Sequence, residues 1–311
     1  MSKLVEREPA PGATSLSATP ALAVQFFLIP LAVVGMVVLV YGGFRMLLTN
    51  ERTPEEFLSD VQTGGRERRW PAAYELSRLM SDPDVESQYP NLGSAIVRAF
   101  ENSEGDAPRV RWYLALAVGR LSNPPADATR VVVEGLDDPD TDTKISVIWA
   151  LASLGDPSVT DVIASMYGSE DPGVRKMAVY ALGGLGTEDL SVLRGALDDP
   201  IPDVQWNAAV ALARQGGSDG MTVLRRMLDR DYVERTVTRV ARVDATLDPV
   251  SEVMISGLQA VAALRSTEMR DTVTSLIEND VSLNVREVAM RTLELLDSDV
   301  TETSDVVRYE R

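Results

Sequence analysis

The sequence predicts an all-α protein, a right-handed α-solenoid of about seven helix pairs preceded by one transmembrane helix. Three observations carry this prediction. One short motif recurs along most of the 311 residues, its apolar positions follow the period of a helix, and a separate apolar run stands near the N-terminus. We divide the chain into a disordered Pro/Ala/Ser/Thr-rich tail at 1–20, the transmembrane helix at 21–48, the solenoid at 49–297 and a C-terminal tail at 298–311.

The apolar run extends over 24 residues from Ala21 to Phe44, and Gln25 is its one strongly polar side chain. A helix of this length reaches about 36 Å, which exceeds the ~30 Å hydrocarbon core of a bilayer. About 20 residues precede the run, and no small-residue cleavage site follows it before Arg45. We therefore expect a single-pass membrane protein with an uncleaved N-terminal anchor, and a cleaved signal peptide is the alternative. The arginines that follow the run favour a cytoplasmic solenoid.

The repeat is clearest from Asp171 to Gly186, which reads DPGVRKMAVYALGGLG. Aligning the copies on their last core position gives spacings of 42, 33, 31, 30, 49 and 32 residues. The aligned positions are Leu79, Leu121, Leu154, Leu185, Gln215, Leu264 and Leu296. A period near 31 residues with two insertions is the sign of a solenoid.

Each copy contains an amphipathic helix, which is the second helix of its pair. In the clearest copy, Val174, Ala178, Ala181 and Leu185 follow the i, i+4, i+7, i+11 spacing of one helix face. Shorter apolar-periodic runs between the copies predict the first helices. Asp-Pro, Gly and Asn at the joints are typical of helix ends, and Asp171 and Asp203 are expected at helix starts.

The string Asp-Pro-x-Val-Arg-x-x-Ala-x-x-Ala-Leu-Gly-x-Leu-Gly at 171–186 resembles the HEAT-like repeat of the PBS-lyase type. The resemblance covers about residues 53–297. The Val-Arg pair recurs as Val110-Arg111 and Val285-Arg286, while the copy at 202–216 has Val204-Gln205 instead. This resemblance implies a solenoid, and it implies scaffolds, adaptors and a few lyases alike.

Aromatic residues are only 5% of the chain, yet all four tryptophans fall at one place in the repeat. They occupy the positions nine and five residues before the aligned core position, which lie about 180–220° from the buried stripe. We call this set the aromatic ladder and predict that it binds a partner: Trp70, Tyr74, Trp112, Leu116, Trp149, Tyr180, Trp206 and Val210. The alternative is that neighbouring helices cover these rings as ordinary packing.

The larger insertion, at 229–249, concentrates arginines. We expect an extra helix there with Arg235, Arg239 and Arg242 as a secondary basic patch for an acidic partner or lipid headgroups. The alternative is that these arginines pair with neighbouring carboxylates of the chain itself.

Composition excludes several kinds of chemistry. The chain has no cysteine and no histidine, so disulfides, thiol catalysis, Ser-His-Asp triads and His- or Cys-ligated metals are absent. Asp138, Asp140 and Asp142 have calcium-loop spacing, but the loop lacks the required Gly and Glu, and we interpret it as a capped turn between repeats. We therefore expect no metal and no cofactor.

The net charge of −17 disfavours nucleic acid as a partner. The favoured function is a membrane-anchored scaffold or accessory subunit that binds a protein partner, itself membrane-associated, and the chain is expected not to be an enzyme. A bilin lyase-like enzyme of the same repeat type is the alternative.

Overall fold

The structure is a computed structural model that describes residues 29–48, 52–237 and 248–309. The predicted tail at 1–20 lies outside this part of the chain. The chain divides into two units, residues 1–53 and residues 54–311, and each is described by itself. Every regular element in the described parts is helical, and these parts contain no strand, which confirms the all-α prediction.

The first unit contains helix α2 (Ile29–Leu48), in which the described side chains at 31–43 are all exposed. Among the described residues, no helix is both long enough and apolar enough to cross a membrane. The predicted single-pass anchor was therefore wrong, and the membrane-associated partner inferred from it loses its basis.

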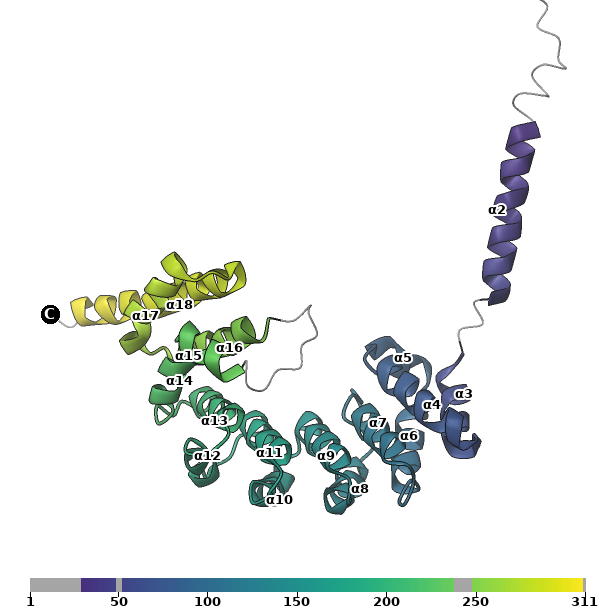
Figure 1. Ribbon diagram of the computed structural model, residues 1–311, viewed down its shortest axis with the longest axis horizontal. Coiled ribbons are helices and arrows are strands. Elements are labelled where there is room, and N and C mark those ends of the chain that lie inside the picture. The colour runs from purple at the N-terminus through teal and green to yellow at the C-terminus, as the bar shows by residue number, and fades with distance from the viewer. Residues whose placement is uncertain (1–28, 49–51, 238–247, 310–311) are drawn as a thin grey trace, which may run out of the picture. The chain divides into compact units, whose positions relative to one another are not determined.

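Figure 1 labels the helices of the second unit. Its described residues contain seven helix pairs, in agreement with the seven copies of the repeat. The first helices are α3 (Pro54–Thr63), α6 (Leu92–Glu101), α8 (Ala128–Val133), α10 (Thr160–Met166), α12 (Ser191–Ala196), α14 (Met221–Met227) and α17 (Arg270–Asn279). The second helices are α4 (Arg66–Leu79), α7 (Pro108–Val118), α9 (Thr141–Leu154), α11 (Pro172–Leu185), α13 (Pro202–Arg214), α16 (Pro249–Leu264) and α18 (Leu283–Tyr309). Helix α18 continues well past residue 297, where the sequence placed the end of the solenoid.

Two helices fall outside the pairs and coincide with the two long spacings of the repeat. Helix α5 (Pro83–Gln88) lies between the first two pairs, and α15 (Arg230–Val237) lies between α14 and α16. Short 3₁₀ turns η2 (Glu134–Asp137), η3 (Pro157–Val159) and η4 (Thr267–Met269) complete the unit.

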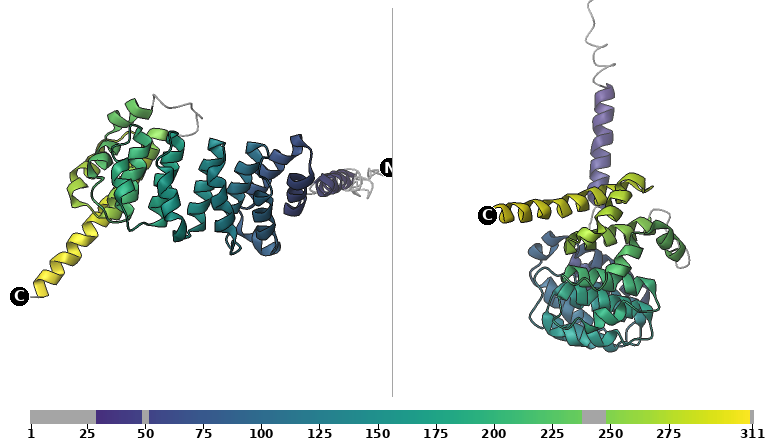
Figure 2. Two further views of the ribbon diagram at one scale, coloured as in Figure 1. Left: turned by 90° about the horizontal axis from the view of Figure 1, so that it is seen from below. Right: turned by 90° about the vertical axis from the view of Figure 1, so that its left-hand side faces the viewer.

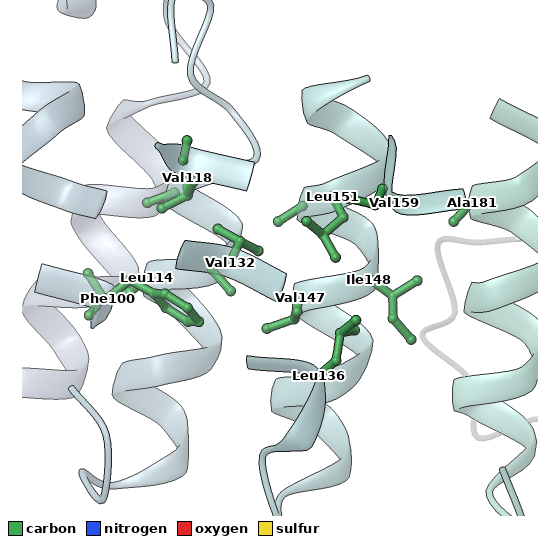
Figure 3. Packing of buried hydrophobic residues seen from close by; sticks show 14 of the residues in the cluster. Phe100, Leu114, Val118, Val132, Leu136, Val147, Ile148, Leu151, Val159 and Ala181 are labelled. Carbon is green, nitrogen blue, oxygen red and sulfur yellow. The ribbon is translucent and has the colours of Figure 1, made fainter. Parts of the chain in front are cut away.

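Each second helix packs against the next one along the chain, and the helices lie side by side in chain order (Figure 2, left). The predicted stripe is the packing surface, since Val174, Ala178 and Ala181 are buried and Leu185 is half-buried. The core is mainly aliphatic, as the low aromatic content requires, with Phe100 as its largest fully buried side chain (Figure 3). It forms two hydrophobic clusters, and α13 contributes residues to both.

Aspartates begin several helices by accepting hydrogen bonds from free backbone N–H groups of the first turn. Asp171 Oδ1 accepts from Gly173 N at 2.8 Å and Val174 N at 3.0 Å, which confirms the predicted start of α11. Asp140 caps α9 by accepting from Thr143 N at 2.8 Å, in agreement with a capped turn at the sequence that resembled a calcium loop. Helix α13 differs, because Ile201 is its N-cap residue and Asp203 lies in its first turn.

Arginines near the starts of helices are tied to aspartates of a later turn. Arg175 Nε lies 2.8 Å from Asp199 Oδ2 and its Nη2 lies 3.2 Å from Asp199 Oδ1. Equivalent pairs are Arg69–Asp106, Arg111–Asp138 and Arg230–Asp280. The planar guanidinium suits this forked geometry. The arginines of the Val110-Arg111 and Val174-Arg175 motifs therefore connect successive turns of the solenoid.

Candidate protein-binding grooves

Six of the eight residues of the aromatic ladder line one or the other of two grooves. We call N-terminal groove the hollow of about 630 Å³ lined by Arg66, Glu67, Trp70, Ala107, Pro108, Arg109, Trp112, Asp140 and Asp142. We call C-terminal groove the hollow of about 670 Å³ that includes Trp149, Tyr180, Trp206 and Val210 in its lining. Tyr74 and Leu116 line neither.

Trp70 and Trp112 in the N-terminal groove have neighbours against their rings. The Arg109 guanidinium lies over the Trp70 ring at 5.2 Å, a cation–π distance. Trp112 stacks on Tyr113, with 5.0 Å between ring centroids and an interplanar angle of 22°. Five of the nine residues that line this groove are charged, so its lining is mainly polar.

The C-terminal groove is lined by residues of α9, α11, α13, α14, α15 and α16 and is mainly apolar. Its apolar lining comprises Trp149, Met177, Tyr180, Ile201, Pro202, Trp206, Val210, Ala211, Met227, Val237, Pro249 and Val253. Helices α11 and α13 approach closely at Gly183, where a Cβ atom would stand 2.6 Å from the Cβ of Ala211. This volume and lining are typical of binding sites for apolar ligands or side chains.

The charged residues of the C-terminal groove balance one another. Lys176 Nζ lies 3.5 Å from Asp203 Oδ2, so this pair is neutral as a unit. Arg214 and Glu252 are exposed and contribute one charge of each sign. The groove therefore has no net formal charge, although the whole chain has a charge of −17.

Trp206 differs from the other tryptophans because it is buried, with only 5% of its surface exposed. The prediction of an exposed ladder was wrong at this position. Trp206 belongs to the second hydrophobic cluster, where Tyr232, Val237 and Val253 from α15 and α16 also pack. The insertion before α16 therefore contributes side chains to the same hydrophobic cluster as this ring.

The indole nitrogen of Trp206 is buried, and no described residue accepts its hydrogen bond. Sequence reasoning did not find this feature. The signal that could have indicated it is the 49-residue spacing that follows the Trp206 copy, since extra chain at that point can cover the ladder.

The remaining ladder residues are at least partly accessible. Tyr180 is 44% exposed at the C-terminal groove, and Trp149 is half-buried with the Arg120 guanidinium 5.8 Å from its ring. Tyr74 is 42% exposed and meets Tyr113 edge-to-face at 5.2 Å. Leu116 is half-buried.

The predicted basic patch is only partly within the described residues. Arg235 is exposed on α15, whereas Arg239 and Arg242 lie outside the described part of the chain. Arg230 at the start of the same helix pairs with Asp280 at 2.7 Å, as the self-pairing alternative expects.

Asp199 holds the turn that precedes the C-terminal groove. Its side chain is 2% exposed, and it accepts from Arg175 and from the backbone N–H of Ile201 at 2.9 Å. Burial raises the pKa of Asp199, but these hydrogen bonds and the Arg175 charge outweigh burial, so the pKa lies below its ordinary value. Burial and then the Asp199 charge raise the pKa of the neighbouring Tyr167.

Comparisons with known proteins agree with this architecture. The family model for HEAT repeats matches residues 98–183 and 160–243. These matches support a HEAT-like repeat protein. No curated protein matches the chain.

Several solved structures are similar to the chain. The complex of CpcE and CpcF of phycocyanin lyase from Nostoc sp. PCC7120 is 19% identical over 79% of this chain and 94% of that chain, with a TM-score of 0.47. Human deoxyhypusine hydroxylase is 18% identical, covering 79% of this chain and 97% of that chain, with a TM-score of 0.34. A designed armadillo repeat protein is 17% identical, covering 79% and 100%, with a TM-score of 0.36. At these identities the likeness concerns the fold alone.

Proposed function

We propose that this chain is a protein-binding scaffold and that the C-terminal groove is its principal binding site. The observation that carries the proposal is that Trp149, Tyr180, Trp206 and Val210, from three successive second helices, line one apolar groove of about 670 Å³. In this proposal the protein works by binding and not by catalysis, and it needs no cofactor or metal.

The chemistry of the groove supports a protein partner. Tryptophan and tyrosine supply large apolar contact with few rotatable bonds, which explains their enrichment at interface hot spots. The exposed Tyr180 and Ile201, at 44% and 37%, stand beside the buried Trp206, so a partner segment has accessible apolar surface to cover. Helical repeats also suit this role, because stacking builds an extended surface from small units.

Two exposed tyrosines at the same position of the repeat provide a matched test. Tyr180 lines the C-terminal groove and Tyr74 lines neither groove, yet their exposed fractions are nearly equal, at 44% and 42%. Random 12-residue peptides displayed on phage are selected on the wild-type chain. The affinities of the selected peptides are then measured for the wild type, Tyr180→Ala and Tyr74→Ala.

We expect Tyr180→Ala to weaken binding by about 2 kcal/mol, roughly thirtyfold, while both variants keep wild-type melting temperatures. Tyr74→Ala should bind as the wild type does. The proposal fails if no peptide is enriched, or if the two variants lose affinity equally.

A further inference from the structure

The C-terminal groove follows the length of α13. The α13 residues in its lining extend from Pro202, the first residue of the helix, to Arg214, the last, and a helix of 13 residues is about 20 Å long. The second helices before and after α13, which are α11 and α16, pack against it and contribute Tyr180 and Val253 to the lining. The groove is therefore long enough for a partner segment that lies along α13.

The groove offers few partners for main-chain hydrogen bonds of such a segment. Its lining is mainly apolar, and the helices that form it satisfy their own backbone N–H and C=O groups internally. The side chains of Asn207 and Thr236 already donate to carbonyl oxygens of their own helices, at 2.7 and 2.8 Å. An extended segment buried here would leave main-chain groups without partners, whereas a helix satisfies them within itself.

The charges of the groove differ between the two ends of α13. Near its start, Asp203 pairs with Lys176 of α11 at 3.5 Å. At its end, Arg214 is exposed, and no carboxylate of the described residues forms an ion pair with it. Glu252, the remaining charged residue of the lining, belongs to the first turn of α16. A carboxylate on the bound segment therefore has an available cation at the end of α13.

The net charge of −17 limits how acidic the bound segment can be. The chain as a whole repels a segment with many carboxylates. One carboxylate at Arg214 instead gains the forked hydrogen bonds that a guanidinium forms with it. These charges favour a segment that is apolar along one face and acidic at one end.

We propose that the C-terminal groove binds an amphipathic α-helix of the partner protein, with its apolar face along α13 and a carboxylate at Arg214. This inference rests on the proposed function and adds the conformation and the charge of the bound segment. Apolar side chains spaced three and four residues apart on that helix lie against Tyr180, Val210 and Val253. An aspartate or glutamate at one end of the helix pairs with Arg214.

The conformation is tested with the phage-selected 12-residue peptide, which is about 18 Å long as a helix. Each peptide residue is replaced by alanine, and the affinity for the wild-type chain is measured. We expect the sensitive positions to be three and four residues apart, because one face of a helix contacts the groove. Proline at an insensitive central position should then weaken binding more than tenfold, because it breaks the helix. Sensitive positions two residues apart, with proline tolerated, would overturn the proposal.

The charge is tested with Arg214→Gln, and Arg225→Gln is the matched control. Arg225 is also an exposed arginine in the last turn of its helix, α14, but it lies outside the lining of both grooves. We expect Arg214→Gln to weaken binding about 3- to 5-fold and Arg225→Gln to leave the affinity unchanged, while both variants keep wild-type melting temperatures. Equal affinities of the wild type and Arg214→Gln for the peptide would overturn the proposal.

A change in the peptide identifies the residue that meets Arg214. When its acidic residue is replaced by the corresponding amide, the peptide should bind the wild type 3- to 5-fold more weakly and lose no further affinity for Arg214→Gln. When the same residue is replaced by arginine, the peptide should bind Arg214→Glu more tightly than the original peptide does. A peptide whose acidic residues act equally on the wild type and Arg214→Gln would contradict the pairing.

The outcomes separate this inference from the proposed function. If the peptide binds and Tyr180→Ala weakens it, but the peptide is extended or insensitive to Arg214→Gln, only the inference is overturned. If no peptide is enriched, or if Tyr180→Ala and Tyr74→Ala lose affinity equally, the proposed function fails and the inference fails with it.

Discussion

The two grooves place the same residue type at the same position of the repeat and surround it differently. In the N-terminal groove, Trp70 lies under Arg109 and Trp112 stacks on Tyr113, among charged neighbours. In the C-terminal groove, Trp206 is 5% exposed within an apolar lining and its N–H has no described acceptor. The comparison shows that position in the repeat does not by itself decide how far a ring is covered, and that the neighbouring elements do.

The cause of the difference is the insertion before α16. Helix α15 and the start of α16 contribute Val237, Pro249 and Val253 to the C-terminal groove. The N-terminal groove is lined from α4, α7 and the residues next to them, together with the acidic start of α9. The added helix thus contributes apolar lining that the charged N-terminal groove lacks.

The largest expected effect is a difference in stability between two variants that each truncate one tryptophan, Trp206 in the C-terminal groove or Trp112 in the N-terminal groove. Trp206→Ala should lower the free energy of unfolding by about 3–5 kcal/mol, because it leaves a cavity in the second hydrophobic cluster. Trp112→Ala should cost about 1 kcal/mol, since the half-buried ring leaves no closed cavity. Denaturant unfolding measures both, and equal losses would show that the grooves do not differ in this way.

Much of the fold could be predicted from the sequence because it depends on local patterns. The helical stripe through Val174, Ala178 and Ala181 predicts which face is buried, and Asp171 with Pro172 predicts where α11 begins. These signals need only neighbours within one helix. The predicted anchor failed, because no helix among the described residues is both long enough and apolar enough to cross a membrane.

The candidate site was only partly predictable, because it depends on contacts between distant segments. The sequence identified Trp149, Tyr180 and Trp206 as candidates, but not the burial of Trp206 or the division into two grooves. The arginine–aspartate pairs were also missed. Arg175 and Asp199 are 24 residues apart, and only the stacked repeats bring them together.

The contact between α11 and α13 in the lining of the C-terminal groove provides a smaller, more local test. Gly183→Val should lower stability by about 2 kcal/mol, because its side chain would displace Ala211 and force the two helices apart. Gly184→Ala is the matched control, since a Cβ there meets nothing within 4 Å and alanine favours the helix. Thermal unfolding of both variants measures the effect. A Gly183→Val protein as stable as Gly184→Ala would mean that the helices are not tightly packed at this point.

The smallest expected effect is a loss of stability in acid, at the turn that precedes the C-terminal groove. The folded-state pKa of Asp199 lies below the ordinary value of 3.8, because hydrogen bonds from Arg175 and Ile201 outweigh burial. A lowered folded pKa means that the ionised carboxylate stabilises the fold above about pH 4, and that this contribution is lost as the pH falls through the folded pKa. We expect a loss on the order of 1 kcal/mol, or about 2–4 °C in melting temperature. Asp199→Asn cannot titrate at this position, so its melting temperature should fall less between pH 5 and pH 2, roughly the range over which such a carboxylate protonates. Parallel pH profiles for the two proteins would show that the Asp199 carboxylate does not hold Ile201 at the groove.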